Sequence, residues 1–119
     1  MIDTLQITSA AQKEIKKRIS GPAKLLLNYN DGVGPYSKVG SCSIGTDFDV
    51  LAVRPNEKTP DYNAQLKSPL GVVSYKKYSA RYLDNGLKLD VDPSFGQLTL
   101  SSAGGLIDGS VQVIDDRKN

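Results

Sequence analysis

The sequence predicts an α+β fold in which short mixed or antiparallel strands form a compact sandwich or partial barrel, with an amphipathic helix at the N-terminus against one face. Residues 8–19 show helical periodicity, whereas most later apolar segments are short, alternate with a period of two and end at turn-forming residues. The chain has too few helices for a doubly wound parallel sheet. Its 119 residues, 39% of them hydrophobic, fit a single domain spanning 1–119.

The N-terminal helix is expected to run to about Ile19. Thr8 or Ser9 can cap its first free N–H groups, and Ser9 with Gln12 has the spacing of a capping box. The apolar stripe consists of Ala11, Ile15 and Ile19. This pattern predicts that one face of the helix packs against the sheet and the other faces solvent.

Basic side chains concentrate on residues 13–18 of this helix. Glu14 precedes Arg18 by four residues, which is the favourable order for an ion pair worth a few tenths of a kcal/mol. The basic cluster can contact an anionic partner, but a solvated helix face explains it more simply.

The strand candidates alternate apolar and polar residues between turn formers and comprise residues 23–30, 46–53, 62–67, 72–75, 87–91, 97–101 and 111–114. A short helix is expected over residues 77–83, followed by a turn at Asn85-Gly86. The turn formers of residues 92–96 predict that the two strands on either side of them pair with each other.

Composition excludes several kinds of site. Without histidine, the chain has no Ser-His-Asp or Cys-His machinery and no His-ligated zinc or haem. With one cysteine, it forms neither an intrachain disulfide nor an all-thiolate metal site by itself. No cofactor fingerprint and no acid–base pair stands out, so we expect that the protein is not an enzyme.

Charge and hydropathy limit the classes of partner and the cellular location that we expect. The net charge of +2, from 15 basic and 13 acidic side chains, is too balanced for a strong field toward nucleic acid or membranes. No apolar run approaches the roughly 20 residues that cross a bilayer. Residues 1–5 lack the features of a signal peptide, and a lone thiol is easily kept reduced inside a cell. We therefore expect a cytoplasmic location.

The lone cysteine lies in a glycine-rich loop of residues 39–45. Gly40 lets the backbone approach closely, and Ser41 and Ser43 add hydroxyl donors that favour a thiolate at Cys42. The simpler interpretation is that Cys42 is a small inert filler of a packed site. No Gly-Lys-Ser/Thr motif accompanies the glycines of this loop, so it is not a nucleotide-phosphate loop.

Four features occur in an order that resembles the HesB/IscA-like iron-sulfur cluster biosynthesis family. They are Ile7-Thr8-x-x-Ala11-x-x-x-Ile15 in the helix, the strand with Leu25-Leu26-Leu27, the glycine-flanked cysteine, and Tyr82-Leu83-Asp84-x-Gly86-x-x-Leu89-Asp90. The resemblance covers most of residues 5–102. It implies a scaffold or carrier of iron or an iron-sulfur cluster, working with assembly and recipient proteins.

The resemblance makes Cys42 the first iron or cluster ligand, set between Gly40, Ser41 and Ser43. Family members add a Cys-Gly-Cys pair near the C-terminus, but residues 101–106 of this chain contain no cysteine. Two of the three family cysteines are thus absent, while a cluster needs about four ligands. A homodimer that brings two Cys42 thiols together would supply two of them. The alternative is an interaction module that kept the fold without the cofactor.

Three weaker candidates remain. Asp47 and Asp49 have oxygen ligands for a hard metal, although a polar strand face explains them more simply. Tyr29 and Tyr36 are explained by packing or loop roles. Residues 76–82 interleave basic and aromatic side chains as in single-strand nucleic-acid binders, but packed tyrosines with solvated lysines are the ordinary explanation.

Overall fold

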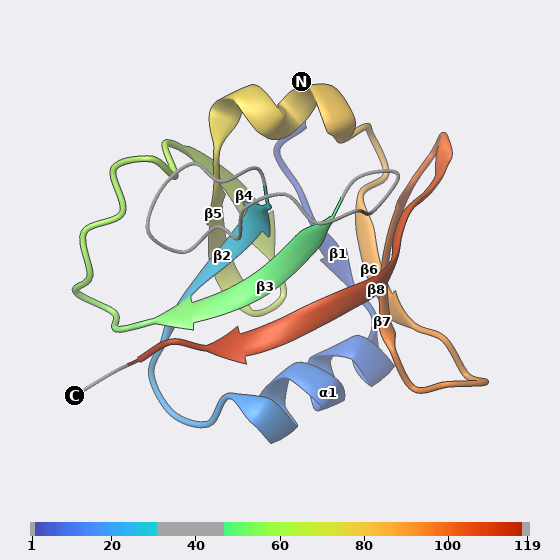
Figure 1. The fold of residues 1–119 in the computed structure, drawn as a ribbon, viewed down its shortest axis with the longest axis horizontal. Coiled ribbons are helices and arrows are strands. Elements are labelled where there is room, and N and C mark those ends of the chain that lie inside the picture. The colour runs from blue at the N-terminus through green and yellow to red at the C-terminus, as the bar shows by residue number, and fades with distance from the viewer. Residues whose placement is uncertain (1, 31–46, 118–119) are drawn as a thin grey trace.

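The computed structural model describes residues 2–30 and 47–117, whose strands form one mixed sheet that curls into a nearly closed barrel (Figure 1). The elements are β1 (Gln6–Ile7), α1 (Ser9–Arg18), β2 (Lys24–Tyr29), β3 (Phe48–Val53), β4 (Ala64–Ser68), β5 (Gly71–Tyr75), the 3-10 helix η1 (Lys77–Tyr82), β6 (Lys88–Val91), β7 (Leu98–Ser102) and β8 (Gly105–Asp115). The predicted α+β class is confirmed. No helix of the described ranges is long and apolar enough to cross a membrane.

The eight strands lie in the order β1-β6-β7-β8-β3-β2-β5-β4. The two outer strands meet through the residues that precede β1. The N–H of Leu5 donates to the carbonyl of Lys67 at 2.8 Å, and the N–H of Lys67 donates to the carbonyl of Asp3 at 2.9 Å. These bonds join the edge of β4 to the start of the chain, so the sheet closes on itself and exposed edges are reduced.

Helix α1 is linked to the barrel by the capping residue that directly precedes it. Thr8 caps the helix: its Oγ1 accepts from the N–H of Ala11 at 3.2 Å and donates to Oδ1 of Asp90 at 2.9 Å. The predicted Ser9–Gln12 capping box is wrong, because Ser9 already lies inside the helix and the side chain of Gln12 donates to the carbonyl of Ile7. One hydroxyl thus caps the N-terminus of the helix and links it to β6.

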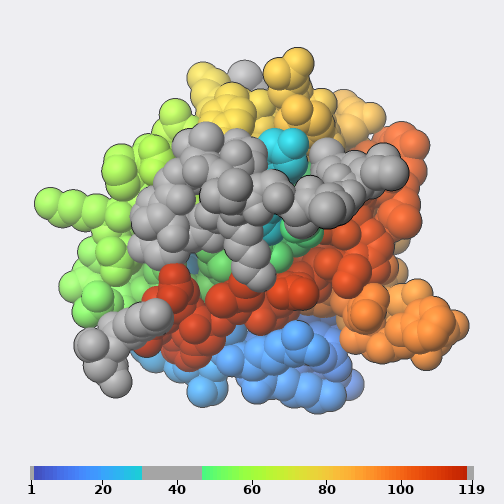
Figure 2. All heavy atoms as spheres, viewed as in Figure 1, coloured from blue at the N-terminus to red at the C-terminus, as the bar shows by residue number. Residues whose placement is uncertain are grey.

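The main hydrophobic core fills the barrel and continues beneath α1. Alternate residues of β2 and β3 point inward, and the intervening residues form a second, smaller cluster on the outer face, made of Leu26, Leu51, Val53 and Tyr62. Both strands are therefore buried on both faces at their centres. Figure 2 shows that α1 and η1 lie at opposite ends of the face on view, with β3 and β8 between them.

The Asn85-Gly86 turn is confirmed, and Gly86 has a positive φ of 75° that favours glycine. A Cβ there would lie 3.3 Å from the backbone nitrogen of Ala103, whose N–H donates to the carbonyl of Asn85 at 2.8 Å. The predicted pairing of the next two strands is also confirmed, with Leu89 opposite Leu100. This turn leads from η1 into β6 and is hydrogen-bonded to the turn between β7 and β8.

Candidate functional site

The sequence-predicted site residues Gly40, Ser41, Cys42 and Ser43 lie outside the described residues, as does Tyr36. The described residues on either side are Asn30 and Asp47, and the N–H of Asn30 donates to the carbonyl of Asp47 at 2.9 Å. The segment that carries Cys42 therefore begins and ends at neighbouring points of the barrel, where β2 ends and β3 begins.

Side chains at this point form a polar cluster, which we define as Asn28, Asn30, Asp47, Asp49, Tyr62 and Lys76. The amide nitrogen of Asn30 donates to Oδ2 of Asp49 at 2.7 Å and lies 3.4 Å from Oδ2 of Asp47. The amide nitrogen of Asn28 donates to Oδ1 of Asn30 at 2.9 Å. Asn30 thus contacts both carboxylates beside the ends of the segment, and Asn28 orients Asn30.

Tyr62 and Lys76 complete the polar cluster from the other side of β2. The hydroxyl of Tyr62 donates to Oδ1 of Asn28 at 2.6 Å. The Lys76 ammonium donates to the carbonyl of Tyr29 at 3.2 Å and lies 5.5 Å from the centre of the Tyr62 ring. Lys76 directly follows β5, which lies next to β2, and Tyr62 shortly precedes β4. The cluster therefore spans four chain segments.

The polar cluster is largely inside the protein. Asn28 and Lys76 are fully buried and Asp49 is 2% exposed. Among the described residues, every fully buried side-chain nitrogen or oxygen has a hydrogen-bond partner. Burial of polar groups is tolerated when they are paired in this way, and such paired networks favour one conformation over others.

Two sequence expectations change here. Asp49 does point away from Phe48, as the strand period predicted, but that face is buried rather than solvated. Lys76, expected to be solvated, is also buried, so it does not contribute to an exposed surface over residues 76–82. The burial of Lys76 could not be predicted from the sequence, because charged side chains are usually exposed to solvent.

Tyr29 has the packing role that the sequence suggested. Its ring centre lies 5.3 Å from that of Phe48 and 4.7 Å from that of Tyr82, so it bridges the barrel and η1. Tyr78 is 50% exposed and Tyr82 is 38% exposed, so neither is packed as fully as the sequence suggested. The ring contacts of Tyr29 with Phe48 and Tyr82 hold η1 over the end of the barrel where the polar cluster lies.

The β7–β8 hairpin reaches the same end of the barrel (Figure 1). Oδ2 of Asp108 in β8 accepts from the N–H of Phe48, the first residue of β3, at 2.9 Å. The cysteine-free residues 101–106 form the end of β7 and the turn into β8. The position where the resembled family carries its cysteine pair is thus on a strand that contacts the start of β3 through Asp108.

The described residues do not by themselves hold a metal. Within residues 2–30 and 47–117, no three Cys, Asp or Glu side chains converge as a metal site. The polar cluster contributes two carboxylates, too few for a hard cation that takes six or more oxygens. Tyr75 adds no anionic ligand near neutral pH, because burial raises its pKa above the usual 10.0.

Sequence reasoning missed Asn28, Tyr62 and Lys76 as members of the cluster. The available signal was Asn28, a polar residue that directly follows the apolar run of β2 in a strand predicted to be buried. A buried amide needs polar partners, which sit elsewhere in the sequence. Pattern alone does not identify those partners.

Comparison with known proteins identifies relatives of the whole fold. Residues 4–115 match the family model described as iron-sulphur cluster biosynthesis. The structure of a candidate Fe-S biosynthesis protein from Lactobacillus salivarius, reported to have a novel fold, aligns with a TM-score of 0.83 and 32% identity over 97% of this chain and 99% of that one. A candidate Fe-S biosynthesis protein from Lactobacillus acidophilus aligns with a TM-score of 0.73 and 26% identity, over 94% and 89% of the two chains. No curated protein sequence matches.

Proposed function

Because the chain belongs to the iron-sulphur cluster biosynthesis family, we propose that it is a non-enzymatic scaffold or carrier that binds iron or an iron-sulfur cluster through Cys42. The observation that carries the proposal is the family match over residues 4–115, which includes the only thiol of the chain. The polar cluster supports it, since Asn30 and Asp47 hold both ends of the Cys42 segment at one end of the barrel.

The ligand count points to a dimer. An iron-sulfur cluster is normally held by about four thiolates or equivalent ligands, and one chain offers one. In a twofold dimer, two Cys42 thiolates share the centre, and a carboxylate such as Asp47 or an external thiol fills the remaining positions. In this proposal the protein receives the iron or cluster from assembly proteins and passes it to recipient proteins. The lone reduced thiol fits a cytoplasmic location.

Anaerobic reconstitution tests the proposal. The native chain and Cys42→Ser are incubated with ferrous iron and sulfide, with a phosphine rather than a thiol as reductant, and are then desalted. We expect visible absorbance and bound iron for the native chain and neither for Cys42→Ser. A parallel sample with added glutathione should raise the yield of the native chain only, because the external thiol fills an open position.

Ser37→Ala is the matched control for Cys42→Ser. It makes a change of similar size in the same segment but keeps the thiol, and it should retain bound iron. Circular dichroism of all three proteins shows whether the fold is preserved. Equal bound iron in the native chain and a folded Cys42→Ser would show that the proposal is wrong.

The second candidate function is a protein-interaction module that binds no cofactor. The absence of cysteine from residues 101–106 favours it. It predicts that neither the native chain nor Cys42→Ser retains iron after desalting, so the same experiment separates the two candidates.

A further inference from the structure

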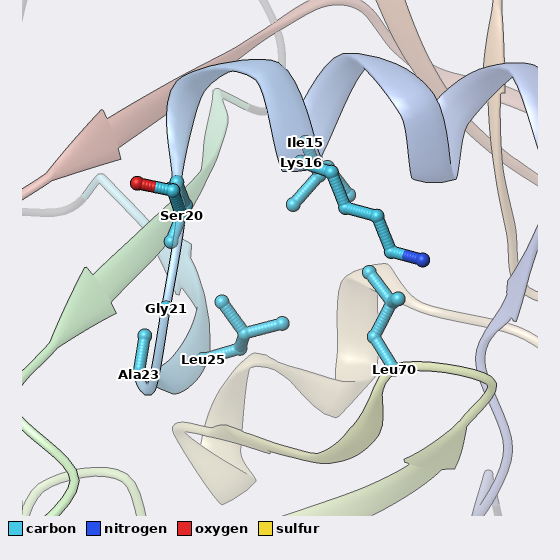
Figure 3. Close-up of a pocket in the computed structure, with 8 residues that line it drawn as sticks. Ile15, Lys16, Ser20, Gly21, Ala23, Leu25 and Leu70 are labelled. Atoms are coloured by element: carbon cyan, nitrogen blue, oxygen red, sulfur yellow. The ribbon is translucent and has the colours of Figure 1, made fainter.

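An apolar groove lies beside α1, at the end of the barrel away from η1 (Figures 1 and 3). It has a volume of about 450 Å³ and lies between the C-terminal half of α1, the segment leading into β2, and the β4–β5 turn. Ile15, Ile19 and Leu25 form its floor and are 3%, 7% and 8% exposed. Leu70 stands on the opposite side and points across the groove toward the helix (Figure 3).

The groove has a fixed wall on the side of the chain reversal after α1. Nη1 of Arg117 donates to the carbonyl of Ser20 at 2.6 Å and to that of Pro22 at 3.2 Å. Gly21 between them has a φ of 80°, which favours glycine. Arg117 is itself held by Asp115 at 2.6 Å. The wall is therefore cross-linked to the C-terminal end of β8 and does not depend on a ligand to form it.

One basic side chain, Lys16, lines the groove, and it belongs to a helix with a net positive charge. Four basic and one acidic side chain give α1 a net charge of +3, whereas the whole chain carries +2, so the rest of the chain is net −1. Glu14 pairs with Lys17 at 3.2 Å and with Arg18 at 3.8 Å, away from the groove. Lys16 lines the groove and forms no ion pair within the described residues. None of the described residues that line the groove is acidic.

We propose that this groove binds an acidic segment of a partner protein, which inserts an apolar side chain between α1 and Leu70 and places a carboxylate beside Lys16. The concave floor suits an inserted side chain, and pockets of this size are a usual feature of binding sites. The +3 helix suits an acidic partner and opposes a second copy of the same basic face. The proposal is independent of iron binding, since it involves neither Cys42 nor any member of the polar cluster.

Fluorescence anisotropy with defined peptides tests the proposal on the full chain. The probe is a short fluorescein-labelled peptide in which glutamates surround leucines. One control peptide has serine in place of every leucine, and another has lysine in place of every glutamate. We expect saturable binding of the probe alone, weakened by added salt because the rim charges are exposed.

Matched variants locate the binding site. Lys16→Glu should weaken binding by about fivefold or more, since it turns an attraction at the rim into a repulsion. Lys77→Glu makes the same change in net charge on exposed η1, at the opposite end of the barrel, and should leave binding near the native value. Leu70→Ser removes the apolar wall at an accessible turn and should weaken binding without altering the salt dependence.

Four results would overturn the proposal, three of them from the peptide experiments. These three are equal effects of Lys16→Glu and Lys77→Glu, equal binding of the leucine and serine peptides, and the absence of saturable binding. Binding to phosphatidylserine vesicles that exceeds binding to the peptide would also reject it in favour of a membrane surface. Each variant is checked by circular dichroism, and the exposed Lys16→Glu keeps the test valid if Leu70→Ser does not fold.

Discussion

The α1 end of the barrel is stabilised by an apolar floor and by hydrogen bonds of exposed or partly buried side chains, whereas the opposite end is stabilised by the polar cluster, most of whose side chains are buried. At the α1 end, Thr8 caps the helix that follows it directly. At the other end, Asn28 depends on Tyr62, which lies 34 residues away. The end of the barrel from which the Cys42 segment starts is therefore organised by hydrogen bonds, whose geometry is strict. Such bonds are suited to fixing the ends of a segment that carries a ligand residue.

Removal of Asn28 should cause the largest loss. Asn28→Ala takes away the acceptor of the Tyr62 hydroxyl and the donor to Asn30 at a fully buried position, so the free energy of unfolding should fall by about 3 kcal/mol. Urea denaturation measures this loss. Tyr62→Phe, which removes only the hydroxyl, should cost about 1 kcal/mol. If Asn28→Ala costs no more than Tyr62→Phe, the polar cluster does not organise this end.

Loss of the Thr8 hydroxyl should have the next largest effect, at the α1 end. Thr8→Ala removes the helix cap and the bond to Asp90, and should lower stability by about 2 kcal/mol. Thr8→Ser keeps both interactions and should stay within about 0.5 kcal/mol of the native chain in the same urea experiment. Equal losses in the two variants would mean that the methyl group, not the hydroxyl, matters.

Asp90 should make the stability of the α1 end depend on pH. The Val91 N–H and then the Thr8 hydroxyl lower its pKa below the usual 3.8. A lowered pKa in the folded state means that its stabilisation is present above 3.8 and is lost as the pH falls through the folded value. Asp90→Asn should therefore be less stable than the native chain at neutral pH, and the difference in stability should narrow as the pH falls below 3.8. A gap that stays constant over that range would contradict this assignment.

The Glu14 ion pairs should have the smallest effect. Glu14→Gln removes the exposed pairs with Lys17 and Arg18, and should lower stability by about 0.3 kcal/mol at low salt and by less at high salt. Thermal melts at the two salt concentrations measure the difference. A loss above about 1 kcal/mol would mean that local charge contributes as much to the α1 end as the Thr8 cap.

The sequence predicted the parts of the fold that are encoded locally. The periodicity of α1, the turn at Gly86 and the pairing of β6 with β7 all depend on neighbouring residues, and all are confirmed. The full length of β8 was missed, because Asp108 and Gly109 resemble a turn in sequence but continue the strand in the structure. Asp108 is kept there by its bond to the backbone of Phe48, a contact across 60 residues.

The candidate site was predicted only in part, for the same physical reason. Cys42 stood out because no other residue of the chain has its chemistry. The polar cluster beside it did not, since a buried lysine such as Lys76 looks like a solvated one until the fold brings Tyr62 beside it. The order of strands in the sheet decides which distant residues become hydrogen-bond partners. The periodicity of the sequence does not predict that order.

Native mass spectrometry of the reconstituted protein tests the central claim most directly, because it counts chains and cluster atoms in one species. We predict that the native chain gives a dimer whose mass includes one iron-sulfur cluster, and that this species disappears in Cys42→Ser while the folded apoprotein remains. A cluster-bearing species of the same mass shift in Cys42→Ser would contradict the assignment of Cys42 as the ligand.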